Sequence, residues 1–339
     1  MSYNIALNFE DGVTRFITCA SSDTVADASY RAGINIPLDC RDGACGTCKS
    51  FCETGTYDGG AYIEDALTNN EAAQGYVLTC QMKPRSDLVL RILAPASACK
   101  AAPVRQEAQI ESVTKLSATT LRFALKLAAP VPFLAGQYVN ILVPGSAQTR
   151  AYSFSSAPGA ATAEFLVRNI RGGLMSSFLT QQAQPGTKLS FIGPVGSFFL
   201  REVKRPVLLL AGGTGLAPLL SMLGQMAAHP PAYPVHLIYG VTNDEDLVEI
   251  DRIEKFAEKI TNFTWSACVA NEAAAYPQKG YVTRHIQPMH LNDGDVDVYL
   301  CGPPPMVEAV RKYFAENAIQ PTSFHYEKFA PSTALGATA

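Results

Sequence analysis

Four cysteines near the start of the chain are spaced as ligands of a metal cluster. Cys40, Cys45 and Cys48 form a C-x4-C-x2-C run, and Cys80 follows after 31 intervening residues. This spacing is typical of a plant-type [2Fe–2S] site, in which one short loop supplies three thiolates and the fourth comes from a distance. Thiolates are soft ligands that suit iron–sulfur clusters or zinc. We therefore predict a [2Fe–2S] cluster on these four cysteines.

Zinc is the alternative metal for these four cysteines. Zinc ribbons usually have two tight cysteine pairs, whereas this chain has one such pair, Cys45 and Cys48, and two single cysteines. Gly43 and Gly46 allow positive φ and a close approach of backbone N–H groups to sulfur, as an iron–sulfur loop needs. Cys52 lies in a strand-like run, and we predict that it is a buried small side chain and not a ligand.

A second set of residues, Arg150-Ala151-Tyr152-Ser153, resembles the Arg-x-Tyr-Ser flavin motif of the ferredoxin–NADP⁺ reductase superfamily. The Arg150 guanidinium can fork onto a pyrophosphate. The ring of Tyr152 can stack on the isoalloxazine, and the hydroxyl of Ser153 can hydrogen-bond its N5 edge, where hydride arrives. Taken alone, these residues could equally be the surface of a strand.

Two later stretches resemble the second and third flavin segments of the same superfamily. Val167 and Arg168 end a strand-like run, and a Gly-Gly-Leu-Met-Ser run follows at residues 172–176. Within that run, Gly173, Met175 and Ser176 would open a helix whose N-terminal amides face a pyrophosphate.

A glycine-rich turn is predicted to bind a dinucleotide. Gly213, Thr214 and Gly215 follow an apolar strand and open a helix, which is the context that a phosphate-binding turn requires. Pro218 takes the place of the third glycine, at little cost near the start of a helix. The stretch 207–228 has no charged residue, but its glycines and Pro218 would break a membrane helix, so we predict a buried strand, turn and helix.

The choice of nicotinamide cofactor can be argued from charge. The stretch 239–246 ends in Asp244-Glu245-Asp246, where the adenosine ribose of a bound cofactor is expected. A 2′-phosphate would need a basic residue there, whereas a ribose 2′-hydroxyl tolerates or uses a carboxylate such as Asp244. We therefore predict NADH and not NADPH.

In this order the motifs resemble the ferredoxin–NADP⁺ reductase superfamily, and the cysteine loop resembles the ferredoxin domain of oxygenase reductases. The resemblance implies that FAD is the flavin. It also implies that Cys301-Gly302-Pro303 places a thiol beside the nicotinamide, and that Glu327 and Phe329 lie over the flavin. Ser153, Cys301 and Glu327 would then surround the hydride transfer. Plain packing remains open for Cys301 and Phe329.

A reductase component of an aromatic-ring-hydroxylating dioxygenase is the family that this domain order resembles. The implied path runs from NADH to FAD, to the [2Fe–2S] cluster and to the Rieske centre of a terminal oxygenase. Reductases of di-iron monooxygenases that act on phenol, toluene or methane share the order and remain an alternative.

Three segments are expected to position these residues. Residues 1–95 are implied to be a β-grasp ferredoxin domain. Short alternating runs divided by Pro and Gly in residues 104–203 predict an antiparallel β-barrel for FAD. Strand–helix alternation in residues 206–330, with one helix predicted over residues 246–259, predicts a parallel α/β domain for NADH. A small-residue linker at 94–103 and a loose tail at 331–339 complete the chain.

Composition excludes some classes of function. The net charge of −3 gives no concentrated basic surface, so we expect no nucleic-acid partner. The N-terminus has no basic stretch followed by an apolar one. We therefore expect a cytoplasmic protein without a membrane partner.

Overall fold

A computed structural model describes residues 1–100 and 104–329 of the chain. The chain divides into two compact units, Met1–Val104 with Val195–Ser197 and Arg105–Pro194 with Phe198–Ala339. The second unit contains both the predicted FAD segment and the predicted NADH segment, whose separate boundaries remain a prediction. Parts of two expected segments, residues 101–103 of the linker and the tail 331–339, lie outside the described residues.

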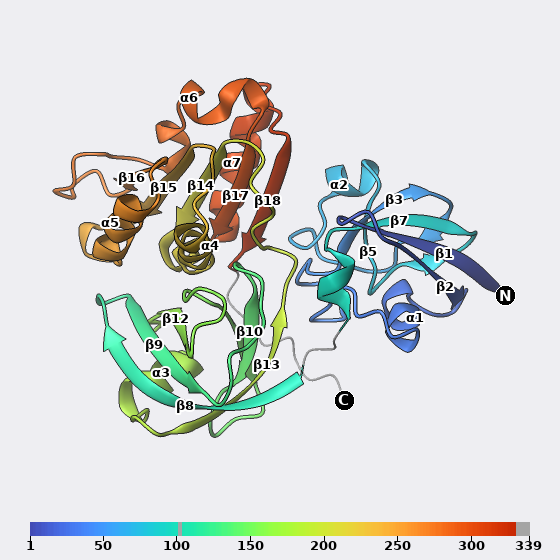
Figure 1. The fold of residues 1–339 in the computed structure, drawn as a ribbon, viewed down its shortest axis with the longest axis horizontal. Helices are drawn as coiled ribbons and strands as arrows, with labels where there is room; N and C mark the ends of the chain where they lie inside the picture. The colour runs from blue at the N-terminus through green and yellow to red at the C-terminus, as the bar shows by residue number, and fades with distance from the viewer. Residues whose placement is uncertain (101–103, 330–339) are drawn as a thin grey trace. The chain divides into compact units, whose positions relative to one another are not determined.

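The first unit is a mixed sheet packed by short helices (Figure 1). Its sheet has the strand order β2-β1-β7-β3-β5, with β1 parallel to β7 and the other pairs antiparallel. Its elements are β1 Ser2–Phe9, β2 Thr14–Ala20, α1 Val25–Arg31, β3 Lys49–Thr54, β4 Tyr57–Asp58, α2 Asn69–Ala73, β5 Tyr76–Leu78, β6 Lys83–Pro84, β7 Leu88–Ile92 and the 3-10 turn η1 Ala96–Cys99.

A six-stranded antiparallel sheet forms the first part of the second unit, and we call residues 105–194 the barrel lobe. Its strand order is β11-β10-β13-β8-β9-β12, and a bridge between Phe154 and Phe165 joins the two edges, so the sheet nearly closes. Its elements are β8 Val104–Lys115, β9 Thr120–Leu127, β10 Tyr138–Leu142, β11 Thr149–Ser153, β12 Thr162–Arg168, α3 Leu174–Gln181 and β13 Lys188–Val195.

The rest of the second unit is a parallel sheet, and we call residues 206–329 the sheet lobe. The strand order is β16-β15-β14-β17-β18, and all neighbours run parallel. Helices flank the sheet (Figure 1). Its elements are β14 Val207–Gly212, η2 Gly213–Gly215, α4 Leu216–Ala228, β15 Val235–Val241, η3 Asp244–Asp246, α5 Ile250–Lys259, β16 Phe263–Val269, η4 Val282–His285, α6 Pro288–Leu291, η5 Asn292–Gly294, β17 Asp297–Gly302, α7 Pro304–Glu316 and β18 Ser323–Lys328.

Both faces of this parallel sheet are covered, as the apolar strands predict. Alternate residues of β14 point to opposite faces: Leu209 packs in one core cluster with residues of α4, while Leu208 and Leu210 pack in another with residues of α7. The uncharged stretch 207–228 is β14, the turn η2 and α4, which confirms the predicted buried strand, turn and helix. The predicted fold class is therefore confirmed.

Two local predictions need correction, and two strands were not predicted. The helix predicted for residues 246–259 begins only at Ile250, because residues 244–246 form a 3-10 turn and Glu249 is left-handed, with φ 61°. Strands β8 and β18 were not predicted, since their mostly polar sequences bury few side chains completely. Cys52 does lie in a strand, but its side chain is only half-buried and its thiol donates to the carbonyl of Thr54.

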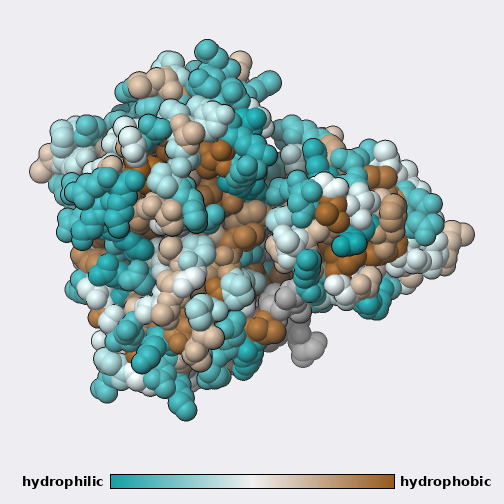
Figure 2. Space-filling view, in the orientation of Figure 1, coloured by the Kyte–Doolittle hydropathy of each residue, from teal (hydrophilic) through white to brown (hydrophobic). Residues whose placement is uncertain are grey.

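No helix in residues 1–100 and 104–329 is both long and apolar enough to cross a membrane. The longest apolar helix, α4, has 13 residues, fewer than the roughly 20 that a bilayer span requires. Figure 2 shows hydrophilic residues over much of the outward surface of the sheet lobe.

The sheet lobe contains a histidine that makes its stability depend on pH. His325 on β18 is partly buried, and its ring centre lies 4.9 Å from that of Tyr299. Burial, together with the nearby charge of Arg201, lowers the pKa of His325 to about 3. The unfolded chain therefore takes up this proton at higher pH than the folded protein. The contribution to stability is present above about pH 6.5 and is lost as the pH falls toward 3.

We expect a His325→Gln variant to lose less stability than the wild type on acidification. Between pH 6.5 and 5 the difference amounts to roughly 2 kcal/mol, since each pH unit below the unfolded pKa costs about 1.4 kcal/mol. Urea unfolding followed through Trp265, the single tryptophan and a residue of the same sheet, measures this free energy. The exposed His229→Gln substitution is the control. If the free energy of unfolding fell equally with pH in His325→Gln and in the wild type, His325 would not cause the loss of stability on acidification.

Candidate active site

The four predicted cluster ligands lie as two pairs. The thiol of Cys40 donates to the sulfur of Cys45, and that of Cys48 donates to Cys80. These hydrogen bonds lower the pKa of Cys45 to about 7 and that of Cys80 to about 6. No set of three or more His, Cys, Asp or Glu side chains within residues 1–100 and 104–329 could hold one metal ion. Two pairs fit a two-iron cluster, which takes two thiolates on each iron, better than a single zinc.

Backbone and side-chain N–H groups point at two of the predicted ligand sulfurs, as the glycine-rich loop predicts. The amides of Ala44 and Cys45 point at the Cys40 sulfur, at 3.4 and 3.3 Å. Gly43 has a φ of +79°, and a side chain there would place its Cβ only 2.5 Å from the carbonyl oxygen of Ala61. Such donors stabilise the negative charge that thiolate ligands carry.

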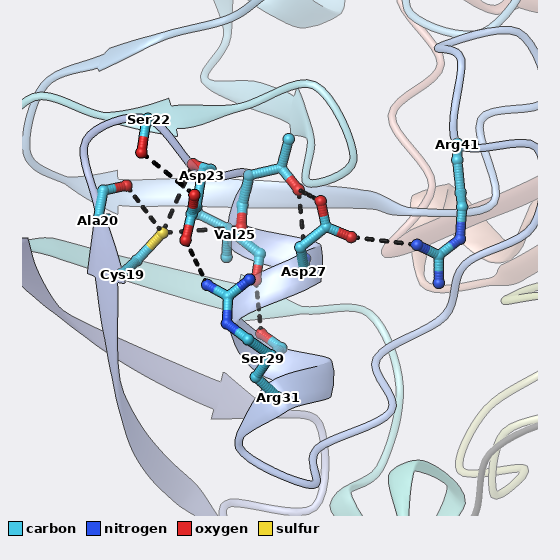
Figure 3. A network of polar contacts seen from close by, with 10 residues as sticks. Cys19, Ala20, Ser22, Asp23, Val25, Asp27, Ser29, Arg31 and Arg41 are labelled. Carbon is cyan, nitrogen blue, oxygen red and sulfur yellow. Dashed lines mark hydrogen bonds and ion pairs between the residues drawn. The ribbon is translucent and has the colours of Figure 1, made fainter.

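One loop residue between the ligands is fixed from three sides. The Arg41 guanidinium lies 3.1 Å from the Asp27 carboxylate of α1 and 5.4 Å from the centre of the Tyr30 ring, and Figure 3 shows the first of these contacts. The Arg41 carbonyl accepts a hydrogen bond from the side chain of Gln81 at 3.1 Å. Because the ion pair with Asp27 is exposed, its energy is small. The contacts therefore define the path of the loop more than they stabilise it.

The predicted flavin motif occupies strand β11 at an edge of the barrel sheet. The Arg150 guanidinium is held by the carbonyl of Thr149 and the side chain of Gln148, both at 2.8 Å. Tyr152 packs edge-on against Phe123 at 6.1 Å and remains half-exposed, and burial raises the pKa of its hydroxyl. Ser153 is buried.

The predicted pyrophosphate segment lies at the N-terminus of α3. Gly173 is the N-cap, and no side chain caps the helix. Met175 is buried in the barrel core, and the Ser176 hydroxyl donates to the carbonyl of Ile170 at 2.7 Å. The helix therefore offers backbone amides toward an anion, whereas the Ser176 side chain is engaged inside the turn. At the end of β12, Val167 is buried and Arg168 is exposed.

The glycine turn and the Cys-Gly-Pro segment meet at the carboxyl edge of the parallel sheet. Gly213 has a positive φ of +54°, and no atom would lie within 4 Å of a Cβ placed there. A Cβ on Gly302 would lie 3.3 Å from the Cα of Gly212 and 2.8 Å from the sulfur of Met306. The ends of β14 and β17 can therefore approach each other only because both positions are glycine.

A contact between the two lobes joins the predicted catalytic residues. The Ser153 hydroxyl donates to the Glu327 carboxylate at 3.2 Å, and Glu327 is paired in register with Cys301 on the neighbouring strand. Burial, reinforced by the charge of Glu327, raises the pKa of the Cys301 thiol well above its usual value. Cys301 is thus a neutral thiol and not a thiolate nucleophile. The amide of Phe329 donates to the carbonyl of Gly302 at 2.8 Å, which places Phe329 directly beyond this edge.

Comparison with known proteins assigns the three segments. Residues 8–85 match the 2Fe-2S iron-sulfur cluster binding domain, residues 107–200 the oxidoreductase FAD-binding domain, and residues 209–312 the oxidoreductase NAD-binding domain. The chain is 58% identical to the toluate 1,2-dioxygenase electron transfer component of Pseudomonas putida, over 98% of this chain and 100% of that protein. This chain belongs to the family of 1,2-dioxygenase electron transfer components.

Further matches agree with this family. The 2-halobenzoate 1,2-dioxygenase electron transfer component of Burkholderia cepacia is 49% identical over 98% of this chain and 99% of that protein. Among solved structures, an Amycolatopsis cytochrome P450 reductase superposes with a TM-score of 0.72 at 32% identity, covering 97% of this chain and all of the other. The electron transfer component is thus an oxidoreductase with [2Fe–2S], FAD and NAD domains.

In this reductase the acidic residues predicted to select NADH also hold the neighbouring loop. Both oxygens of Asp244 accept backbone N–H groups, from Ala275 at 2.5 Å and Tyr276 at 2.9 Å. These hydrogen bonds lower the pKa of the Asp244 carboxyl. Asp246 accepts from the backbone of Asn243 at 3.1 Å, while Glu245 is exposed. We propose that this fixed negative charge disfavours a 2′-phosphate.

We expect the reductase to use NADH in preference to NADPH by at least about tenfold in kcat/KM, which corresponds to ~1.4 kcal/mol. Steady-state turnover with an artificial acceptor at equal cofactor concentrations measures this ratio. Glu245→Lys should lower the ratio of kcat/KM for NADH to that for NADPH without disturbing the loop held by Asp244. Equal or better use of NADPH by the wild type would contradict the proposal.

Several residues of the site were not predicted from sequence. Gln81, directly after the predicted ligand Cys80, has its side-chain nitrogen 3.7 Å from the Cys80 sulfur, and its position beside a predicted ligand was the one available signal. Glu249 and Arg252 connect the sheet lobe to barrel residues 97 to 127 positions away in the chain. Patterns among neighbouring residues in the sequence cannot predict such long-range contacts.

Proposed function

We propose that this chain is the NADH-oxidising reductase of benzoate 1,2-dioxygenase and delivers electrons to the Rieske centre of the terminal oxygenase. The observation that carries this proposal is the Ser153–Glu327 contact at 3.2 Å, which joins the flavin motif of the barrel lobe to the edge of the parallel sheet in the sheet lobe. When bound, FAD would supply the conversion between the two electrons of a hydride and the single electrons that a [2Fe–2S] cluster accepts.

The residues of this edge have separate tasks in the proposal. Ser153 presents its hydroxyl where it can donate to a flavin edge, and Glu327 accepts a hydrogen bond from this hydroxyl in the structure. Cys301 is a small, neutral, buried thiol, so it can shape the nicotinamide pocket without bringing a charge. The backbone of Phe329 is held by Gly302, which places the aromatic side chain beyond the strand end and in contact with the core of the sheet lobe.

The flavin phosphates have a matching set of cations and donors. Arg150 is half-exposed and Arg168 is exposed, while the N-terminus of α3 provides backbone amides. A pyrophosphate is bound well by such a combination of guanidinium and helix N-terminus. The turn at Gly213, Thr214 and Gly215 provides the second phosphate site, that of NADH.

The substrate class follows from the relatives. The two named above are electron transfer components of dioxygenases for toluate and 2-halobenzoate, both of which are substituted benzoates. We therefore infer a partner oxygenase that acts on benzoate or a close derivative. The alternative, a di-iron monooxygenase for phenol, toluene or methane, differs in the acceptor and not in this chain's predicted sites.

Oxygenase-coupled turnover tests the proposal. The purified chain is mixed with NADH and, in separate reactions, with a benzoate-type Rieske oxygenase and with a phenol-type di-iron hydroxylase, each with its own aromatic substrate. We expect NADH oxidation coupled to product formation with the Rieske oxygenase. Coupled turnover with the di-iron enzyme alone would establish the alternative.

A further inference from the structure

Arg252, on helix α5 of the sheet lobe, reaches the barrel lobe close to the predicted flavin motif. Its guanidinium donates to the carbonyl of Ser155 at 2.5 Å and lies 3.0 Å from the Glu164 carboxylate. Ser155 is two residues beyond Ser153. Both lobes belong to one compact unit, so this is a contact inside that unit.

A buried carboxylate of the sheet lobe lies beside the same guanidinium. The side chain of Glu249 is only 3% exposed, accepts hydrogen bonds from Arg122 at 3.1 and 3.3 Å, and lies 4.0 Å from Arg252. Charges therefore alternate along the row Glu164, Arg252, Glu249 and Arg122, and each lobe supplies one acid and one base. A carboxylate as buried as that of Glu249 depends strongly on such partners.

The backbone at Glu249 is in an unfavourable conformation. Its φ of 61° and ψ of 19° lie in the left-handed region, which glycine and asparagine occupy more easily than glutamate. A position before a helix that needed only the turn would be expected to carry glycine. The strain is maintained where the carboxylate contacts two guanidinium groups, which indicates that this row of charges is the reason for it.

The main chain of Ser155 is fixed at both of its polar groups. Its amide donates to the carbonyl of Glu164 at 2.7 Å, and its carbonyl accepts from Arg252. Ser153, two residues earlier, therefore has little freedom to shift along the barrel edge. Since Ser153 also contacts Glu327, a displacement of this segment would change the distance between the flavin motif and the sheet edge.

We infer that Arg252 is a positioning residue for hydride transfer: it fixes the Ser153 segment of the barrel lobe relative to the Cys301–Glu327 edge of the sheet lobe. This inference rests on the proposed function. Ser155 and Glu164 contact different nitrogens of the guanidinium, Nη2 and Nη1, which suits the planar fork of arginine and not the single ammonium of lysine. Arg252 touches neither reacting atom, so it acts through the backbone of Ser155.

Stopped-flow reduction of the flavin by NADH, without oxygen and in the full-length holoprotein, tests this role. Arg252→Gln removes the charge, Arg252→Lys keeps it without the fork, and Lys255→Gln on the exposed side of the same helix is the matched control. We expect Arg252→Gln to lower the limiting rate by about tenfold or more, since small displacements of reacting groups cost up to 10²-fold. Arg252→Lys should lie between Arg252→Gln and the wild type, and Lys255→Gln should match the wild type.

Two further readouts separate positioning from a general loss of structure. The NADH concentration at half-saturation should stay unchanged, and deuterium at the transferred position of NADH should slow Arg252→Gln by a larger ratio than the wild type. A wild-type limiting rate in Arg252→Gln, or a loss confined to NADH binding, would overturn the inference. If Arg252→Gln does not retain FAD, the same criteria apply to Arg252→Lys. A wild-type protein whose flavin NADH does not reduce would instead contradict the proposed function.

Discussion

Replacing Cys48 by alanine is expected to abolish electron delivery to a one-electron acceptor while leaving the reduction of the flavin by NADH intact. Cys48 is 3% exposed and pairs with Cys80, so its loss leaves one iron of the proposed cluster with a single protein ligand. Changes to residues that only support metal ligands already cost about 10–100-fold in affinity, and loss of a ligand costs more. The visible absorption of the cluster and the rate of cytochrome c reduction measure the two consequences.

The neighbouring cysteine provides a matched control for this variant. Cys52 lies in the following strand, is half-buried and donates its thiol to the carbonyl of Thr54. Cys52→Ala should therefore keep both the cluster absorption and cytochrome c reduction. If Cys48→Ala kept them too, or if Cys52→Ala lost them, the ligand set would be wrong.

Replacing Ser153 by alanine is expected to slow flavin reduction by about 10²-fold, the typical cost of removing one hydrogen-bond donor from a site where charge develops. The Ser153 hydroxyl is buried and donates to Glu327 at 3.2 Å, so it is already oriented in the protein. Stopped-flow absorbance at the flavin band measures the rate. The cluster absorption should not change, because the substitution lies in the other compact unit.

Ser177→Ala is a suitable comparison for this variant. Ser177 also belongs to the barrel lobe, on α3, but lies outside the β11 motif. NADH should reduce the flavin of Ser177→Ala at the wild-type rate. A wild-type rate of flavin reduction in Ser153→Ala would show that Ser153 does not take part in the proposed hydride transfer. Equal losses of rate in both variants would indicate a general effect on the barrel.

The sequence allowed the cluster loop to be predicted because its geometry is local. Three of the four cysteines lie within nine residues, and Gly43 has the positive φ that the loop spacing implied. The parallel sheet was also predictable, because strands buried on both faces, such as β14, have continuous apolar sequences. In both cases the physical cause of the structure lies within a few neighbouring residues.

The remaining features depend on contacts that are distant in the chain. Strand β18 was not predicted because it lies at the edge of the sheet and all six of its residues are half-buried, so no alternation marks it. Helix α5 begins later than predicted, at Ile250, because the left-handed residue before it, Glu249, places its carboxylate against Arg122, 127 residues away. Such pairings depend on how two lobes pack, which periodicity does not encode.

Anaerobic titration of the holoprotein with NADH tests the central claim most directly. Flavin and cluster are followed by visible absorbance, and the reduced cluster by electron paramagnetic resonance. If the chain connects NADH to a [2Fe–2S] cluster through its flavin, substoichiometric NADH produces the spectrum of a reduced [2Fe–2S] cluster as the flavin band is lost. A cluster that stays oxidised while NADH fully reduces the flavin would contradict this account.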